Sequence, residues 1–286
     1  MSFSISGDKL AVVGADPNHT IVIYNAKTGS FLSQMKGSTS VISAIQFKDD
    51  SEFVTVGPKH YQFCQFKNKS IKSKKGIFGK NNNKLTCVTF KGNYALCGSM
   101  NGDIQIWRGN RCEKNYPIHK KALDAIFVNP TYVVTGGRDC MIYLLDRATF
   151  DKLSSINLQK ICIDSYAPMP RSVCLNIDNK RILVGTSGSE ICEFTCYETK
   201  FSGKSHWKYE SIIKSHYCPN KKGNNQVWGL GVYKDDDQYV TCSDDGTVRL
   251  WSSKHKKQLK CFSLNRNIQG IPLKISKTDS SINPAA

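Results

Sequence analysis

The sequence contains no long hydrophobic run. Apolar stretches such as residues 132–134 and 142–145 are only a few residues long, whereas a helix that crosses a bilayer needs about 20. Residues 1–14 also lack the basic and apolar regions of a signal peptide. We therefore expect a cytoplasmic protein with no membrane partner. In that compartment, the twelve cysteines are expected to be reduced thiols.

Sequence motifs that mark common enzymes are also absent. The chain has no GxSxG, no GxxxxGK[ST], no HExxH and no Gly-rich dinucleotide turn after a strand. His206, His216 and Cys218 lie close together in the sequence, but their spacing matches no common zinc pattern. We therefore predict a protein that is not an enzyme, with no catalytic, cofactor-binding or metal-binding residues.

Acidic residues and arginine are scarce beside lysine. There are 23 Asp and Glu against 40 Lys and Arg, which gives a net charge of +17, and only eight of those 40 are Arg. This excess favours an acidic partner. Phosphate and base recognition relies on the arginine fork, so the lysine bias disfavours nucleic acid. Alternatively, a chain rich in Lys and Asn reflects an A/T-rich genome, and its charge has no function.

A short hairpin pattern repeats along the chain. It is clearest in residues 239–251, YVTCSDDGTVRLW, where two alternating apolar runs flank an Asp-Gly turn and the second run ends in Trp. Six copies follow one another at a period of about 40 residues, which is typical of a β-propeller with four short strands in each blade. The sequence therefore predicts an all-β fold, a WD40-type β-propeller.

The predicted propeller covers residues 1–262, with six recognisable four-stranded blades of an incomplete seven-bladed ring. The blades are expected at residues 3–36, 41–76, 85–116, 122–158, 172–213 and 227–262. Residues 263–286 are expected to be a C-terminal tail or a partial seventh blade. Because unpaired sheet edges recruit strands, we expect this tail to add strands beside residues 3–6, or to leave a gap that a partner or second copy fills.

Five segments resemble the first β-propeller of the echinoderm microtubule-associated protein-like (EML) family of WD40 proteins. They are residues 53–66, 74–90, 98–112, 133–146 and 227–251. The most specific features are Gly57-x-Lys59-His60, Lys75-Gly76-x-Phe78 and Val227-Trp228-Gly229-Leu230. The resemblance covers about residues 3–262. Phe66 and Leu145 stand where the family pattern has a blade-ending aromatic.

Two groups of polar residues are predicted to form hydrogen-bonded networks inside blades. One consists of Thr241, Asp245 and Trp251, with His216 as a possible fourth member, and the other pairs His119 with Asp139. A buried carboxylate needs such partners to offset its desolvation. We expect these networks to be structural rather than catalytic.

Four basic clusters are candidate contacts for an acidic partner: residues 67–84, 120–121, 200–222 and 254–260. We expect all four in loops, where propellers usually bind partners. The individual candidates are Lys72, Lys74, Lys75, Lys80, Lys84, Lys254, Lys256 and Lys257. A solvated face without a partner explains any single cluster at least as well.

The resemblance implies a non-catalytic, microtubule-associated protein that binds tubulin and lies on the cytoskeleton, with the ciliary axoneme as one location. Lysine-rich loops suit the acidic tails that tubulin exposes. The alternative is a general protein–protein adaptor, within a multi-subunit complex, that never touches tubulin. Nucleic-acid binding rests on charge alone.

Overall fold

Nearly all secondary structure of the protein is β-strand. The structure, a computed structural model, describes residues 1–78, 84–162, 167–176, 178–196, 207–216, 226–232, 238–264 and 275–277. The chain divides into two compact units, Met1–Asp139 with Arg147–Phe150 and Cys140–Asp146 with Asp151–Ala286.

Six antiparallel sheets are present in the described residues, and each contains consecutive strands paired in chain order. One four-stranded meander for every 40 residues or so is the blade of a β-propeller. The predicted all-β, WD40-type propeller fold with six four-stranded blades is therefore confirmed. The sheets begin and end within a few residues of the six predicted ranges.

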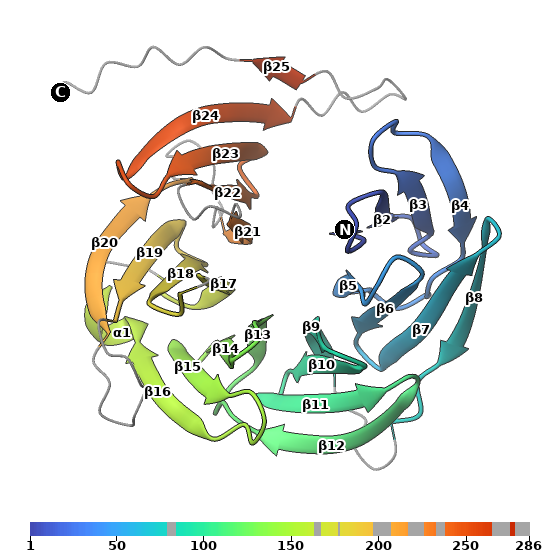
Figure 1. Cartoon of the computed structure of the whole chain (residues 1–286), viewed down its shortest axis with the longest axis horizontal. Helices are drawn as coiled ribbons and strands as arrows, with labels where there is room; N and C mark the ends of the chain where they lie inside the picture. Colours follow the sequence, from blue (N-terminus) through green and yellow to red (C-terminus); the bar gives the residue numbers. More distant parts are fainter. Residues whose placement is uncertain are drawn as a thin grey trace. The chain divides into compact units, whose positions relative to one another are not determined.

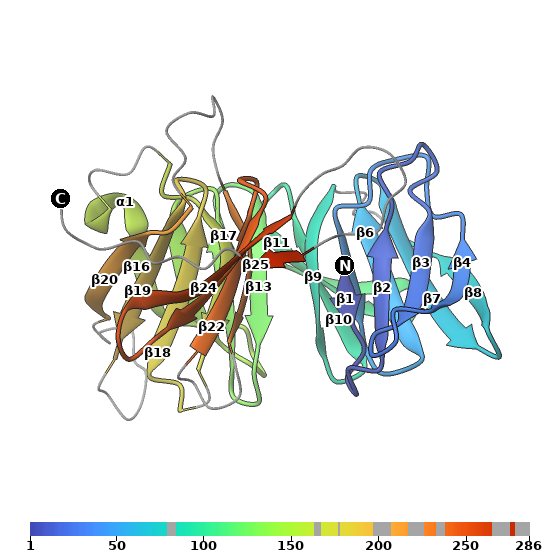
Figure 2. The ribbon, with the colours of Figure 1, turned by 90° about the horizontal axis from the view of Figure 1, so that it is seen from above.

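The first unit contains three complete sheets and the first two strands of the fourth (Figure 1). Seen from above, the blue strands of the first sheet run alternately up and down (Figure 2). In chain order the strands are β1 (Ser2–Phe3), β2 (Lys9–Val13), β3 (Ile21–Asn25), β4 (Phe31–Met35), β5 (Ala44–Phe47), β6 (Glu52–Gly57), β7 (His60–Lys67), β8 (Ser70–Lys75), β9 (Leu85–Lys91), β10 (Tyr94–Ser99), β11 (Asp103–Arg108), β12 (Arg111–Pro117), β13 (Leu123–Val128) and β14 (Tyr132–Gly137).

The second unit contains the remaining strands and a single short helix among its described residues. These elements are β15 (Met141–Asp146), β16 (Lys152–Asn157), α1 (Leu158–Ile161), β17 (Pro170–Leu175), β18 (Arg181–Thr186), β19 (Glu190–Thr195), β20 (Lys208–Lys214), β21 (Val227–Val232), β22 (Gln238–Ser243), β23 (Thr247–Ser252), β24 (Lys257–Leu264) and β25 (Ile275–Lys277).

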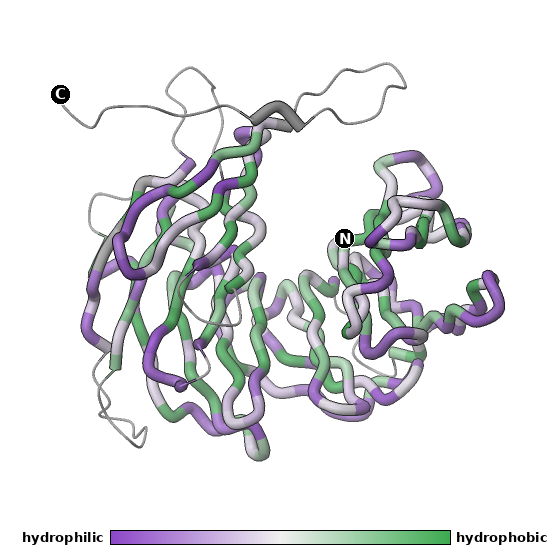
Figure 3. The backbone as a smooth tube through the Cα atoms, turned by 45° about the horizontal axis from the view of Figure 1, so that its top comes forward, coloured by the Kyte–Doolittle hydropathy of each residue, from purple (hydrophilic) through white to green (hydrophobic). Residues whose placement is uncertain are grey.

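Central strands are buried on both faces because a neighbouring sheet covers each face. In β6, Phe53 belongs to the apolar cluster shared with the first sheet, whereas Val54 and Val56 belong to the cluster shared with the third. This alternation follows from the two-residue period of a strand. The outer strand β8 is mostly exposed, and the lysine-rich tip of the β7–β8 hairpin is hydrophilic (purple in Figure 3).

The Lys75-Gly76-x-Phe78 segment joins the second sheet to the third through aromatic rings. Tyr61 stacks on Trp107 with ring centroids 3.9 Å apart, and Phe78 meets the edge of the same indole at 4.9 Å. A Cβ atom on Gly76 would lie only 2.7 Å from the Cβ of Tyr61. Glycine is therefore required here by the close approach of the rings.

The structure describes a short part of the C-terminal tail and does not place it beside residues 3–6; the alternative, a gap filled by a partner or second copy, stays a prediction. Within residues 265–286 it describes only Ile275–Lys277. This strand pairs with β24, in a register that runs from Phe262 opposite Lys277 to Leu264 opposite Ile275. It is the edge strand of a five-stranded sheet (Figure 1), not a strand beside residues 3–6.

The position of the blade-ending residue in the second sheet also needs correction. In the third sheet Trp107 lies opposite Ala95, the second residue of its strand. The corresponding residue in the second sheet is opposite Phe53, and it is Cys64 rather than Phe66. The hairpin loop between β6 and β7 has only two residues. The blade-ending position is therefore reached earlier in the sequence than the spacing of the other repeats predicts.

Candidate functional site

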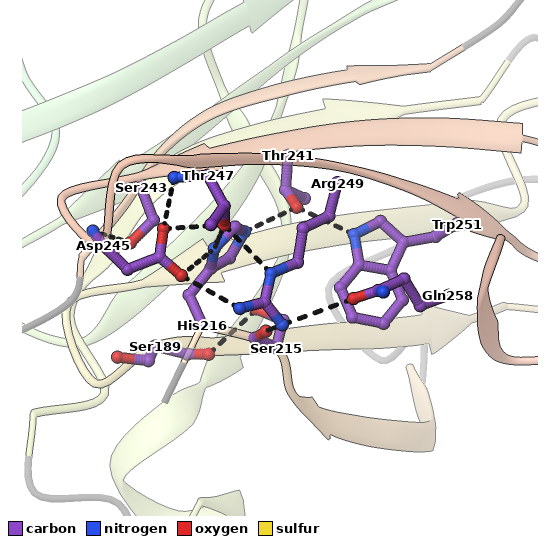
Figure 4. A network of polar contacts seen from close by, with 10 residues as sticks. All are labelled: Ser189, Ser215, His216, Thr241, Ser243, Asp245, Thr247, Arg249, Trp251 and Gln258. Carbon is purple, nitrogen blue, oxygen red and sulfur yellow. Dashed lines mark hydrogen bonds and ion pairs between the residues drawn. The ribbon is translucent and has the colours of Figure 1, made fainter. Parts of the chain in front are cut away.

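A hydrogen-bonded network lies inside the sixth sheet, and it brings four of the predicted residues together (Figure 4). The Nδ1 atom of His216 is 2.9 Å from Oδ2 of Asp245, and its Nε2 atom is 2.8 Å from Oγ1 of Thr241. The indole N–H of Trp251 donates to the same Thr241 oxygen over 2.8 Å. Because His216 and Thr241 are fully buried, these polar atoms need such partners.

Thr247 and Arg249 extend this network, although the sequence pattern did not single them out. Thr247 Oγ1 donates to Asp245 over 2.8 Å, and the Arg249 guanidinium lies 3.1 Å from the other carboxylate oxygen. Both alternate with Trp251 along β23, so all three side chains leave the same face. That alternation in the sequence TVRLW was the available signal.

The electrostatics of Asp245 identify it as the anionic centre of the network. Burial raises the pKa of this carboxyl, but hydrogen bonds from His216 and Thr247 outweigh burial and lower the pKa to about 2. The side chain is only 5% exposed. An ionised carboxylate so surrounded stabilises the hairpin and offers no vacant coordination for a substrate.

A shorter version of the network lies in the fourth repeat. The imidazole of His119 joins Oδ1 of Asp139 at 2.9 Å and Oγ1 of Thr135 at 3.0 Å. The backbone N–H of Lys120 donates to the other Asp139 oxygen over 3.0 Å. A Cβ atom on Gly137 would lie 2.4 Å from the imidazole. Leu145, which has no N–H to donate, occupies the sequence position of Trp251.

The second sheet keeps the buried threonine of this arrangement. Thr55 lies opposite Ile45, as Thr135 lies opposite Ile126 in the fourth sheet. In both sheets, the residue after the threonine pairs with an alanine of the first strand: Val56 with Ala44 in the second sheet, and Gly136 with Ala125 in the fourth. The three buried threonines Thr55, Thr135 and Thr241 therefore occupy equivalent places.

The other two members are replaced in the second sheet. Ser38 donates its N–H to the Asn18 carbonyl over 3.0 Å, as His119 donates to the Gly102 carbonyl over 2.9 Å. Serine thus stands where the fourth repeat has histidine. The β6–β7 loop has two residues, Pro58 and Lys59, against three between β14 and β15. Lys59, with a φ of 53°, matches the left-handed Cys140 that follows Asp139, so this shorter loop supplies no carboxylate.

A cavity of about 490 Å³ lies beside these replaced positions. Its lining includes Ser38, Lys59, His60 and Lys75, and no Asp or Glu is among the described residues that line it. Gln62 also lines it, and because Gln62 and Lys75 are paired across the ladder, their side chains leave the same face of the sheet.

The one histidine of the lining is neutral near pH 7. The Nε2 atom of His60 is 2.8 Å from Oγ1 of Thr55. Burial lowers the pKa of His60 to about 4, and the positive charges of His19 and Lys75 add to that effect. His19 reaches the rim, where its Nδ1 atom is 2.8 Å from the Ser38 carbonyl oxygen.

The lysines of the first candidate cluster lie in a different setting from the one expected. Lys72, Lys74 and Lys75 are on strand β8 rather than in a loop, and all three are exposed. A run of Lys and Ser becomes a strand because β7 supplies the hydrogen-bonding partner. Lys84 is exposed just before β9, and Lys80 lies outside the described residues.

The lysines of the candidate cluster at residues 254–260 divide into two kinds. Lys254 and Lys257 are exposed at the β23–β24 turn. Lys256 instead pairs with Glu193, whose side chain is only 7% exposed, so it compensates a buried carboxylate of the neighbouring sheet. Much of the cluster at residues 200–222 lies outside the described residues.

No group of three or more His, Cys, Asp or Glu side chains comes close enough to hold a metal ion in the described part of the chain. Of the three residues weighed as ligands, only His216 is described, and it serves the network above. The eleven described cysteines are free thiols. Among the described helices, none is long and apolar enough to cross a membrane.

Comparison with known proteins adds a family to this geometry. Residues 1–194 match the family described as the echinoderm microtubule-associated protein first beta-propeller, and residues 211–252 match the WD domain, G-beta repeat. The chain is 27% identical over 87% of its length to ciliary WD repeat-containing protein ctxp80 of Euplotoides octocarinatus. It is 24% identical over 88% of its length to mouse echinoderm microtubule-associated protein-like 2. The matched regions are 32% and 37% of those relatives, so the chain spans about a third of their length.

Proposed function

This chain belongs to the echinoderm microtubule-associated protein family, whose first β-propeller it matches over residues 1–194, and we propose that it is a non-catalytic scaffold that binds tubulin. The fold supplies a rigid frame of antiparallel sheets with hydrogen-bonded centres. The polar groups of the described networks are engaged in those centres, so the exposed outer strands and turns are the surfaces left for a partner.

The observation that carries this proposal is the row of exposed lysines on β8. Lys72 and Lys74 alternate along the strand, so their side chains leave one face roughly 6.8 Å apart. Neither lysine has an ion pair with any described carboxylate. Such a row is a ladder of positive charge, and it is complementary to an extended acidic peptide.

The proposed partner is the acidic surface of tubulin, and the proposed place is the cytoskeleton of the cytoplasm. The family name supports association with microtubules, and one relative is named as a ciliary protein. Those relatives are about three times as long as this chain. Tubulin binding and a ciliary location are therefore part of the proposal for this chain.

Co-sedimentation with taxol-stabilised microtubules tests the proposal. We expect the protein to pellet with microtubules at low salt and to be released as salt rises, because screening weakens surface charge attraction. Microtubules stripped of their acidic tails by limited proteolysis should retain less of it. A folded protein that stays in the supernatant at low salt would contradict direct binding.

A charge-reversal pair locates the contact. Lys72→Glu with Lys74→Glu should reduce pelleting at least fivefold. The matched control is Lys114→Glu with Lys160→Glu, which changes the net charge equally at exposed positions on β12 and α1. Equal losses in both pairs would mean that only total charge matters. Recovery of a stable partner set without tubulin in a pull-down would instead support the general adaptor.

A further inference from the structure

The cavity beside β7 and β8 has a definite structural origin. In the fourth repeat, an imidazole and a carboxylate fill the equivalent place, with His119 and Asp139 2.9 Å apart. In the second repeat, Ser38 stands where the fourth has His119, and the shorter loop Pro58-Lys59 has no carboxylate. A serine is much shorter than a histidine, and the Lys59 side chain is exposed, so the buried volume is left open as a cavity.

The cavity also differs in charge from the fourth repeat, because it is lined by cations where that repeat holds the Asp139 carboxylate. Two lysines, Lys59 and Lys75, line the cavity, and none of its other described lining residues is acidic. The charges that act on His60 inside it are positive, from His19 and Lys75. A concave site lined by one sign of charge concentrates the opposite ion. The hydroxyl groups of Ser38 and Thr39 add hydrogen-bond donors at the rim.

We propose that this cavity binds carboxylate side chains of an acidic peptide segment. The proposal deepens the function above, since the segment would be the acidic tail of tubulin. A volume of about 490 Å³ lies within the usual range of roughly 300–1,000 Å³ for ligand sites. The rings of Tyr61 and Phe78 form an apolar wall for the methylene groups that carry each carboxylate.

Carboxylate fits the lining better than phosphate does. Phosphate sites usually use the fork of arginine or a series of backbone N–H groups from a glycine-rich loop or helix terminus. No arginine is among the described residues that line the cavity. Its cations are lysines, which act as point charges. Lys72 and Lys74 leave the opposite face of β8 from Lys75, so the cavity and the exposed lysine row are separate positive surfaces.

The backbone of Lys59 is left-handed, as it is at Lys69 and Lys256 in other tight turns. Its φ angle of 53° lies in the left-handed region, which costs a residue with a side chain roughly 1 kcal/mol. Glycine or asparagine would relieve that cost at this two-residue hairpin loop. A lysine kept there places its ammonium group at the cavity in spite of the strain.

Fluorescence anisotropy with a labelled hexaglutamate peptide at low salt tests the proposal on the full chain. We expect saturable binding that Lys59→Glu with Lys75→Glu weakens at least tenfold. The control pair Lys114→Glu with Lys160→Glu, which has the same net charge, should change the affinity less than threefold. A hexaglutamine peptide should not bind. Equal losses in the two pairs would overturn the proposal.

A second measurement does not depend on a folded variant. In the unaltered protein, bound carboxylates should raise the pKa of His60 above its value of about 4, which NMR of the imidazole reports. The other titratable and charged groups facing this ring are His19, Lys59 and Lys75. No change in the His60 titration at saturating peptide would contradict binding in the cavity. Displacement of the peptide by inorganic phosphate at lower concentration than by free glutamate would assign the site to phosphate instead.

The outcomes separate this inference from tubulin binding itself. If the cavity pair loses hexaglutamate but the unaltered protein never pellets with microtubules, the tubulin proposal fails and the carboxylate site stands. If the unaltered protein pellets and the cavity pair pellets and binds peptide equally well, the tubulin proposal stands and the cavity inference is wrong.

Discussion

The sixth and second sheets use equivalent positions in opposite ways. In the sixth sheet, Asp245 is surrounded by donors, and Thr241 joins a histidine to a tryptophan. In the second sheet, the equivalent Thr55 contacts His60, and Lys59 lines an open cavity that has no carboxylate among its described lining residues. The comparison teaches that a repeat can give up its polar centre and gain a binding site without losing its fold.

The second sheet obtains its stability from a different source. Tyr61 stacks on Trp107, and the Tyr61 hydroxyl donates to the Gly109 carbonyl over 2.8 Å. Aromatic pairs of this kind contribute roughly 0.5–1.5 kcal/mol beyond the area they bury. This apolar joint between the second and third sheets stabilises the repeat whose polar network is incomplete.

Removing the carboxylate of the sixth sheet should have the largest effect. Asp245→Ala leaves His216, Thr247 and Arg249 without their shared acceptor, and we expect a loss of about 3 kcal/mol in the free energy of unfolding. Urea denaturation followed by tryptophan fluorescence measures it. The control is Asp244→Ala, at the exposed neighbour, which should change stability by less than about 0.5 kcal/mol. Similar values for both variants would contradict a stabilising network.

Disturbing the aromatic joint of the second sheet should come next. Gly76→Ala places a Cβ atom 2.7 Å from the Tyr61 Cβ and 3.0 Å from the indole of Trp107. We expect a loss of roughly 2 kcal/mol, since such overpacking typically costs 1–3. Differential scanning calorimetry checks it. Gly92→Ala tests the backbone alone, since Gly92 has a positive φ and open space around it. A wild-type melting temperature for Gly76→Ala would show that the rings tolerate a methyl group.

The pH dependence of stability should also distinguish the two sheets. The folded-state pKa of His60 is about 4, below its ordinary 6.5, so the unfolded state binds more protons between these values. The stability that neutral His60 contributes is complete above pH 6.5. As the pH falls toward 4, the free energy of unfolding decreases by roughly 1–2 kcal/mol after solvent screening. His60→Asn should flatten that window in urea titrations. The stability that ionised Asp245 contributes is lost at lower pH, as the pH falls from 3.8 toward about 2. An unchanged slope in His60→Asn between pH 4 and 6.5 would refute the assignment.

Relief of the strained turn should have the smallest effect on stability. Lys59→Gly removes the left-handed strain at φ 53°, and we expect a gain of about 0.5 kcal/mol in thermal unfolding experiments. The same variant should bind hexaglutamate several-fold more weakly, because one ammonium group is gone. A gain in stability together with a loss of binding would show that the lysine is retained for its charge. Parallel losses of both would point to an ordinary structural role.

The sequence predicts most of the fold because its signals are local. The alternation and Asp-Gly turn of residues 239–251 specify a hairpin on their own, and His216, Thr241 and Asp245 indicate the network. Strand β8 could not be recognised, since its lysines and serines have little strand preference and its pairing comes from β7. The short loop before His60 likewise hid Cys64 as the blade-ending residue.

The cavity could not be predicted from residue patterns, because it arises from what Ser38 and Lys59 fail to fill. A motif search finds residues that are present, whereas an open volume depends on the length of side chains brought together from three segments of the chain. Aligning each repeat on its buried threonine would have supplied the signal. In that alignment, the loop Pro58-Lys59 stands out because it lacks the acidic residue that Asp139 and Asp245 supply.

Filling the cavity and reversing one of its charges tests the account most directly. In the variant Ser38→His with Lys59→Asp, the longer side chain at residue 38 should occupy part of the cavity, and a carboxylate replaces one of its two ammonium groups. We predict that hexaglutamate affinity, measured by anisotropy, falls at least tenfold while the melting temperature stays the same or rises. Affinity within twofold of the unaltered protein, in a variant that melts normally, would contradict the claim that the lost polar centre became the binding site.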